Sequence, residues 1–346
     1  MTVESTTATE RGAELGHGTA ARHLIHCPPS WDRYLLEAPG SSEEHFVLAG
    51  DLPAAHPLFN DGSGHLHDPQ LLTDTVREIG EFVGHQYFGV PQDRPGLFHR
   101  FGLDLTGTAP WRTRPGPSPS PGPGPGPHRA RLLTRLAVRP VHGMAGVPRG
   151  LEFRLETAID DVVCATGSAG LVFLMPALHR NHVAQSRRAL RTAPTERTSY
   201  EEHSWPVSPA EVGRRSEANV VVREDLAAAA GPGRLATWIV PRPDEPVFAG
   251  PGGGGLSGLL LLEGLRQSAL LTAARSGLVD VDRAVLGSFD VRLTGYAAED
   301  LPLRCTVVAE PVARGRELEA ALTVTQNGRP VADARARVVQ DPNSNL

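Results

Sequence analysis

Lysine is absent from this sequence, so all 34 of its basic side chains are arginines. A lysine amine is the nucleophile of Schiff-base aldolases and pyridoxal enzymes, and it is the point charge of Walker-type phosphate loops. The composition therefore excludes these three classes. Any anionic ligand must be bound by arginine or by backbone amides.

Cysteine is scarce as well. Cys27, Cys164 and Cys305 lie far apart and form no C-x-x-C pair, so neither a zinc knuckle nor a disulfide framework is indicated. We expect them to be small buried hydrophobic residues. His65 and His67 offer only two closely spaced metal ligands, and H-E-x-x-H does not occur. We expect no metal and no other cofactor.

The chain also lacks a basic charge balance and long apolar runs. A net charge of −5 and a pI of about 6.3 argue against nucleic acid as a partner. No apolar run approaches the roughly 20 residues of a membrane span. Residues 1–20 have no hydrophobic region of a signal peptide and are typical of a disordered tail. We therefore expect a cytoplasmic protein that binds neither membrane nor nucleic acid.

What the chain does contain is an internal repeat. Asp74 and Glu263 differ by 263 − 74 = 189 positions, and Arg77 and Arg266 differ by the same number. This offset also aligns the motif His-Pro-Leu-Phe at 56–59 with Glu-Pro-Val-Phe, 189 positions later. Two copies in the same order predict two domains of one fold.

The remaining sequence sets the expected boundaries of these domains. Residues 21–176 form the first domain, 177–204 a polar, arginine-rich linker, and 205–341 the second domain. The run PGPSPSPGPGPGP at 115–127 interrupts the first domain. Such a run cannot form a core, and we expect an extended, mobile spacer.

Each repeat contains one helix pattern. In the first repeat Asp68 is a suitable N-cap and Pro69 occupies the first helical position. Apolar residues then follow at helical spacing, with polar residues on the adjacent face: Asp74, Arg77, Glu78, Glu81 and His85.

The second helix pattern, GLLLLEGLRQSALLTAA at 258–274, is apolar on nearly every side, which is typical of a buried helix. Its only charged residues are Glu263 and Arg266. A buried unpaired charge is costly, so we expect each of them to contact a partner or a ligand.

Strand patterns follow both helices, at 101–107, 130–138 and 151–174 and again at 288–295, 303–310, 318–326 and 330–339. One helix and an antiparallel meander, occurring twice, predict an α+β double hotdog, in which each sheet wraps its own helix and the two sheets pair side by side. The chain then supplies both halves of the hotdog pair. We expect a monomer or weak homodimer.

These motifs resemble those of the A-factor (γ-butyrolactone) biosynthesis hotdog family, the AfsA-like proteins. The similarity extends from about residue 20 to 340 and is carried by HPLF (56–59), LHDPQLL (66–72), GVP (89–91) and LLLLEGLRQSA (259–269). It implies transfer of a β-ketoacyl group from an acyl-carrier-protein or CoA thioester to a hydroxyl of dihydroxyacetone phosphate, in butenolide signal biosynthesis.

The resemblance also implies functional positions. Asp74 stands where the family has a functional glutamate, and Glu263 with Arg266 matches the acid and arginine of the second half. The chain departs from the family pattern at three places. Asp74 is one methylene shorter, Glu78 replaces a glutamine, and GGGGLSG (252–258) replaces an Asp-His-x-Pro-Gly-like entry.

Acyl transfer to an alcohol requires a base, donors facing the oxyanion and a cation for a phosphate. We expect Glu263 to be the general base, because an apolar environment raises the pKa of a carboxylate. Arg266 would position it or bind phosphate. The amides at the start of the first helix would face the thioester carbonyl. The other catalytic candidates are Asp74 and His67, and the other substrate-binding candidates are Arg77, Glu78, His85 and Asp68.

Structural interpretations of these residues remain open. Glu263 and Arg266 can form a buried structural pair, and Asp74 with Arg77 a surface helix pair. Two other functions remain open too. One is a hotdog dehydratase, thioesterase or cyclase acting on a carrier-bound polyketide, with His67 and an acid in acid–base roles. The other is a non-catalytic acyl-binding protein.

Overall fold

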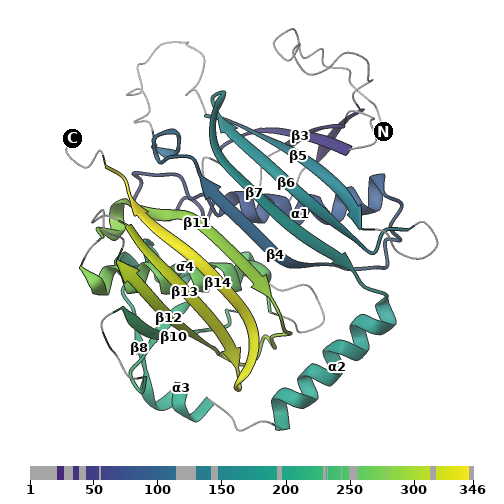
Figure 1. The fold of residues 1–346 in the computed structure, drawn as a ribbon. Helices are drawn as coiled ribbons and strands as arrows, with labels where there is room; N and C mark the ends of the chain where they lie inside the picture. The colour runs from purple at the N-terminus through teal and green to yellow at the C-terminus, as the bar shows by residue number, and fades with distance from the viewer. Residues whose placement is uncertain are drawn as a thin grey trace.

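The described residues form one antiparallel sheet of 14 strands, and its central part is seen in Figure 1. The computed structural model describes residues 22–26, 34–38, 44–53, 56–113, 130–141, 147–192, 197–228, 231, 233–242, 244–248, 256–277, 279–311 and 317–342. The proline- and glycine-rich run at 115–127, the proposed tail at 1–20 and Cys27 lie outside these residues.

The first repeat contributes seven strands and one central helix. The strands lie in the sheet in the order β1-β2-β3-β5-β6-β7-β4. Their bounds are β1 Arg22–His26, β2 Tyr34–Ala38, β3 Glu44–Asp51, β4 Gly96–Leu105, β5 Arg131–Val141, β6 Gly150–Ile159 and β7 Val162–Phe173, and the helix is α1, Leu71–Tyr87.

The second repeat contributes seven strands in the order β11-β14-β13-β12-β10-β9-β8. Counted outward from the centre of the sheet, this order is equivalent to that of the first repeat. The elements of the second repeat are β8 Ser204–Pro206, β9 Val222–Asp225, β10 Arg234–Ile239, α4 Gly258–Ser276, β11 Ala284–Leu293, β12 Leu303–Pro311, β13 Glu317–Gln326 and β14 Arg329–Gln340. All strand patterns expected after the two helices are present.

Equivalent hairpin turns confirm that the repeats share local geometry. Asp160 and Asp161 join β6 to β7, and Asn327 with Gly328 joins β13 to β14, at an offset of 327 − 160 = 167. All four residues have positive φ, between 47° and 73°. Two central residues with positive φ form the type I′ turn, whose twist matches that of a two-stranded ribbon.

The two half-sheets join at one seam, where β4 pairs antiparallel with β11. Leu103 lies opposite Phe289 and Gly102 opposite Asp290. The two strands are neighbours at the centre of Figure 1. This pairing completes a continuous sheet within one chain, so the double-hotdog prediction is confirmed.

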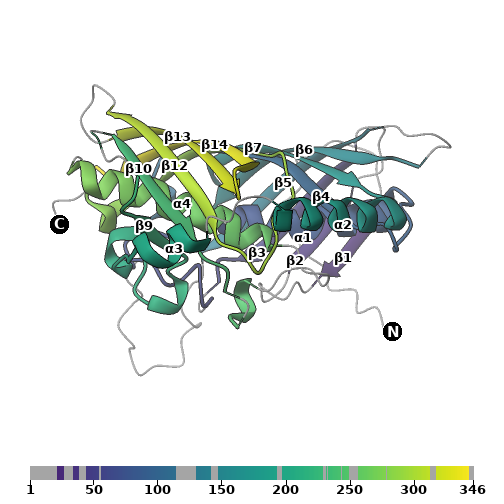
Figure 2. The same ribbon diagram turned by 90° about the horizontal axis from the view of Figure 1, so that it is seen from below.

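Both central helices lie on one side of the sheet (Figure 2). In α1 the predicted apolar face is buried, including Leu72, Val76, Ile79 and Val83. In α4 every residue from Leu259 to Ala273 is buried, as expected for a helix that is apolar on all sides. Cys164 and Cys305 are buried free cysteines, as expected.

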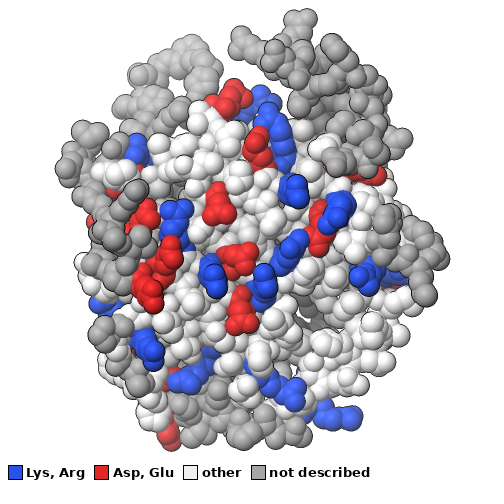
Figure 3. Space-filling view, viewed as in Figure 1, with Lys and Arg blue, Asp and Glu red and all other residues white. Residues whose placement is uncertain are grey.

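The connection between the repeats is helical, which the sequence analysis did not predict. It forms α2 (Pro176–Thr192) and α3 (Arg197–His203), and α2 lies beside the sheets in Figure 1. The outer face of the sheet carries intermixed positive and negative side chains (Figure 3), some in cross-strand ion pairs such as Arg135–Glu156 at 3.0 Å. No helix in the described part of the chain has the length and hydrophobicity that a membrane span requires.

Candidate active site between the repeats

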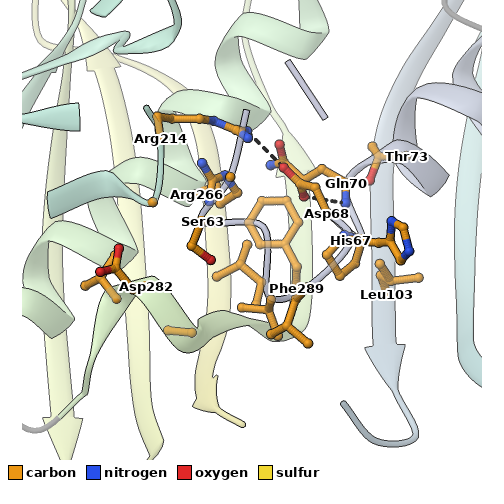
Figure 4. A pocket seen from close by; sticks show the side chains of 18 residues that line it. Ser63, His67, Asp68, Gln70, Thr73, Leu103, Arg214, Arg266, Asp282 and Phe289 are labelled. Atoms are coloured by element: carbon orange, nitrogen blue, oxygen red, sulfur yellow. Dashed lines mark hydrogen bonds and ion pairs between the residues drawn. The ribbon is translucent and has the colours of Figure 1, made fainter. Parts of the chain in front are cut away.

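A small pocket lies where the first turn of α1 faces the second repeat (Figure 4). Its volume is about 50 Å³. The apolar wall comes from both sides of the seam, with Leu103 of β4 and Leu286 and Phe289 of β11. The polar wall also comes from both repeats: His67, Asp68, Gln70 and Thr73 from the first, Arg214 and Arg266 from the second.

The turn before α1 brings the first group of polar residues to this pocket. Asp68 Oδ1 accepts a hydrogen bond from the Gln70 amide at 3.0 Å, and the amides of Leu71 and Leu72 donate to carbonyls of the same turn. The helix therefore begins at Leu71 rather than at Pro69, although Asp68 does cap the turn. Because these amides are already occupied, the expectation that they face a thioester carbonyl is wrong.

Glu263 lies at the centre of a buried network of ions. Its side chain is 0% exposed, and it accepts bonds from Nε of Arg214 at 2.8 Å and from Nη2 of Arg214 at 2.7 Å. Arg266 donates to it through Nε and Nη2, both at 2.9 Å, and Gln267 Nε2 donates as well. Both carboxylate oxygens are thus occupied by protein donors.

This arrangement sets the protonation state of Glu263. Burial raises its pKa, but the charges of Arg214 and Arg266 and their hydrogen bonds outweigh burial and lower the pKa to about 2. The expectation of a raised pKa is therefore wrong. The apolar sequence of α4 indicates burial, but it does not show that Arg214 also pairs with Glu263. A fully paired carboxylate of such low basicity is a poor general base, and the geometry favours the structural interpretation of Glu263 with Arg266.

Arg214 connects this network to the first repeat. Its Nη2 lies 2.9 Å from Oδ2 of Asp68, and its Nη1 donates to the carbonyl of Leu58 at 2.9 Å. Burial lowers the pKa of Arg214, but Glu263 and Asp68 more than compensate, so its pKa lies above the usual range. Asp68, expected to bind substrate, lines the pocket and also forms part of the link between the repeats.

Arg266 has donors that remain available. Its Nε and Nη2 bond to Glu263, and Nη2 also donates to the carbonyl of Val212 at 3.1 Å. Nη1 has no hydrogen-bond partner among the described residues. Because Arg266 lines the pocket and its other nitrogens are fixed, it offers two oriented N–H groups to an anionic ligand.

His67 supplies a basic group in the same pocket. Its backbone amide donates to the carbonyl of Trp111 at 2.8 Å, while its ring nitrogens have no partner among the described residues. In Figure 4 the imidazole lies beside Leu103, with Thr73 on the same side of the pocket. Burial lowers the pKa of His67, so the ring is neutral at pH 7 and can accept a proton.

Asp74 is 2% exposed, so the interpretation of Asp74 and Arg77 as a surface helix pair is wrong for Asp74. It lies close to the buried His56 of the HPLF motif. Burial lowers the pKa of His56, and the negative charges of Asp74 and Asp68 oppose that effect. His56 Nδ1 accepts from the amides of Leu58 and Phe59, each at 3.1 Å, so the motif fixes the turn that carries the Leu58 carbonyl to Arg214.

Of the remaining predicted site residues, His85 is described and does not line the pocket. His85 lies in the last turn of α1, where Nδ1 is 3.0 Å from the carbonyl of Val90 and Nε2 is 3.7 Å from Glu81, which favours its structural interpretation. The side chains of Arg77 and Glu78 lie outside the described residues, as does the glycine-rich segment 251–255 before α4.

Among the pocket residues that sequence reasoning missed, Arg214 and Gln70 make the contacts that join the two repeats. Arg214 lies in an irregular segment after the short 3-10 helix η3 (Pro209–Val212), where no periodicity distinguishes it from other arginines. Gln70 donates from Nε2 to the carbonyl of Leu262 at 3.0 Å, across 192 positions. The buried charge of Glu263 was the one available signal, since it indicated that a cation must lie nearby.

Comparison with known proteins supports the family resemblance. The model of the A-factor biosynthesis hotdog domain matches residues 196–340. The chain is 25% identical over 343 residues to a 2-oxo-3-(phosphooxy)propyl 3-oxoalkanoate synthase of Streptomyces griseus, covering 96% of each chain. The enzyme of the same name from Streptomyces virginiae is 25% identical over 301 residues, or 85% of this chain and 88% of that one.

Among solved structures, a 12:0-ACP thioesterase from Umbellularia californica is similar, with a TM-score of 0.48 and 8% identity over 86% of this chain and 94% of that one. The resemblance to the A-factor hotdog proteins, predicted from the motifs of both repeats, is confirmed by the family model and by the full-length relatives.

Proposed function

We propose that this protein is an acyltransferase that moves a 3-oxoacyl group from a carrier-protein or CoA thioester to the hydroxyl of dihydroxyacetone phosphate or a closely related phosphorylated alcohol. The observation that carries the proposal is the presence, in one pocket, of a neutral imidazole, His67, and a guanidinium, Arg266, whose Nη1 has no hydrogen-bond partner among the described residues. The name of the Streptomyces relatives describes an ester between a 3-oxoalkanoate and a phosphorylated three-carbon alcohol.

His67 is the base of the proposed reaction. Its imidazole takes the proton of the acceptor hydroxyl as the oxygen attacks the thioester carbonyl carbon. A tetrahedral oxyanion forms, and its collapse breaks the carbon–sulfur bond. The imidazolium returns the proton to the departing thiolate, so that ester and free thiol leave and the enzyme is unchanged.

Arg266 binds the phosphate of the acceptor through its two Nη1 N–H groups. Glu263 holds the guanidinium at two other nitrogens, which limits its rotation. Arg214 holds Glu263 and Asp68 together. Glu263 and Arg214 are therefore positioning residues, whereas His67 and Arg266 contact the reactants.

The apolar wall formed by Leu103, Leu286 and Phe289 suits the acyl chain. A volume of about 50 Å³ holds only a few water molecules, so these side chains must move apart when the chain enters.

Mass spectrometry of the purified protein with a 3-oxoacyl thioester, with and without dihydroxyacetone phosphate, tests this proposal. We expect the phosphorylated ester and free thiol only when both substrates are present. His67→Gln should lower the rate by roughly 10²–10⁴-fold. His65→Gln is the matched control, since His65 is exposed and does not line the pocket. Failure of the wild type to form ester would reject the proposal.

The pH dependence gives a second test of the role of His67. Because burial lowers its pKa below the ordinary value of 6.5, the acidic limb of the rate profile should have its midpoint below 6.5. A midpoint above 6.5 would contradict a burial-shifted imidazole as the base.

Hydrolysis is the competing reaction, because a free, neutral His67 can also activate water. It would give a thioesterase, one of the alternatives that the sequence leaves open. The same mass spectra distinguish the two. A thioesterase releases the 3-oxo acid at a rate that does not depend on the phosphorylated alcohol.

A further inference from the structure

Gln70 presents a buried acceptor that the fold leaves unused. Its side chain is 5% exposed and lines the pocket beside His67 and Asp68. Its Nε2 donates to the carbonyl of Leu262 at 3.0 Å, which identifies the other amide atom as the oxygen. That oxygen, Oε1, is buried and has no hydrogen-bond partner among the described residues.

A buried acceptor without a partner is uncommon and destabilising, because it loses its bond to water and gains none in the protein. In a pocket that binds a ligand, such an atom indicates that the ligand carries the missing donor. The nearby cations do not fill this role, since Arg214 and Arg266 direct their described bonds to Glu263, Asp68 and backbone carbonyls.

The reactants of the proposed function contain few donors. The ketone and thioester carbonyls of the acyl group only accept hydrogen bonds, and so does a fully ionised phosphate. The acceptor hydroxyl has one proton, which must be directed to His67 for the reaction to occur. The remaining donors closest to the reacting sulfur are the two amide N–H groups of the pantetheine arm, through which both a carrier protein and CoA hold their thioesters, and the hydroxyl of that arm lies beyond both amides.

We propose that Gln70 binds the thioester arm, with Oε1 accepting a hydrogen bond from the pantetheine amide nearest the sulfur. Gln70 thereby places the thioester beside His67, and its contact with Leu262 ties this placement to α4 of the other repeat. The inference rests on one part of the proposed function, namely that the substrate is a thioester of a pantetheine arm. It applies whether the acyl group passes to an alcohol or to water.

The test compares two small 3-oxoacyl thioesters. One is the N-acetylcysteamine thioester, which retains this amide, and the other is its isostere with oxygen in place of the N–H. With the wild type we expect kcat/KM for thioester consumption to be roughly 3- to 10-fold higher for the amide, the range of one hydrogen bond. In Gln70→Leu the ratio should fall to about 1.

The control is Thr73→Val, which removes a hydroxyl from the same pocket and should retain the wild-type ratio. A wild type that shows no preference for the amide overturns the proposal without any variant, so poor folding of Gln70→Leu does not leave the question open. A Gln70→Leu protein that still prefers the amide compound also overturns the proposal. The same holds if the substitution changes only the KM for the phosphorylated alcohol.

Dissociation constants of the two non-cleavable thioether analogues provide a readout that needs no catalysis. A preference in binding with no ester formed would retain the role of Gln70 and reject the proposed transfer. Ester formation with equal binding and equal kcat/KM for the two compounds would support the proposed transfer and reject the role of Gln70.

Discussion

The two repeats carry the same helix at the same place in the sheet but use it differently. The turn before α1 places His67, Asp68 and Gln70 at the pocket. The corresponding positions around the start of α4, at the offset of 189, are Leu256, Ser257 and Leu259. Within the helices themselves, it is the second repeat that carries the larger polar network. Glu263 in α4 anchors two arginines, while Asp74 in α1 is buried beside His56.

This difference shows how a duplicated fold can divide one site between its copies. The first repeat supplies His67 and Gln70, whose ring nitrogens and Oε1 have no partner in the part of the chain that the structure describes. The second supplies the fixed cation Arg266. Neither repeat contains both sets. The ion network through Arg214 holds the two sets together, because Arg214 contacts Asp68 on one side and Glu263 on the other.

The largest expected effect comes from removing the charge of Glu263, the carboxylate of the second repeat that pairs with two arginines. Glu263→Gln keeps the side-chain shape but leaves Arg266 buried without its counter-charge. We expect a loss of roughly 3–5 kcal/mol in the free energy of unfolding, measured by chemical denaturation. Asp74→Asn is the matched change in the first repeat and should cost only about 1 kcal/mol. Equal losses would remove the energetic distinction between the two helices.

The same residue predicts a pH dependence of stability. The pKa of Glu263 falls from 4.5 to about 2 on folding, so its contribution to stability is complete above 4.5 and is lost as the pH falls toward 2. The difference in free energy of unfolding between the wild type and Glu263→Gln should therefore narrow across this window. A difference that stays constant from pH 5 to pH 2 would show that the carboxylate is not stabilised by its arginines.

Binding stoichiometry sharpens the comparison further. Because only the first helix is preceded by the histidine and glutamine of the pocket, we expect one molecule of a non-cleavable 3-oxoacyl thioester analogue to bind per chain in titration calorimetry. His67→Gln should leave this number unchanged, since it removes a base and not the binding surface. Two molecules per chain would mean that the second entry is also a site.

The smallest effect is expected from shortening the proline- and glycine-rich run at 115–127, which has no counterpart in the second repeat. The strands β4 and β11 are offset by 188 positions and β6 and β13 by 167, so the connection from β4 to β6 in the first repeat exceeds its counterpart by 188 − 167 = 21 residues. Deleting residues 116–126, within the proline- and glycine-rich run, should change stability by less than about 1 kcal/mol and leave the transfer rate nearly unchanged, because closure entropy varies only logarithmically with loop length. Loss of soluble protein on deletion would show that the run has contacts its composition does not indicate.

Much of the fold could be predicted because its signals are local. Strand alternation, the apolar face of α1 and the apolar composition of α4 each lie within fewer than twenty consecutive residues. The predicted start of α1 at Pro69 was wrong, because Asp68 and Pro69 form a separate turn and the helix begins at Leu71. The helices α2 and α3 were not predicted, because a polar, arginine-rich segment has the same composition as a solvated loop.

The sequence by itself determined that the chain is a tandem repeat, that α4 is buried on all sides, and that Glu263 and Arg266 need partners, since each follows from composition and spacing alone. Only the tertiary structure decided which partners they have. Arg214 lies 49 positions from Glu263, and Gln70 lies 192 positions from the carbonyl that it contacts. The direction of a pKa shift depends on the balance between desolvation and the charges within a few ångströms. One further arginine, brought in by the fold, changed Glu263 from an expected base into the ionised centre of a buried network.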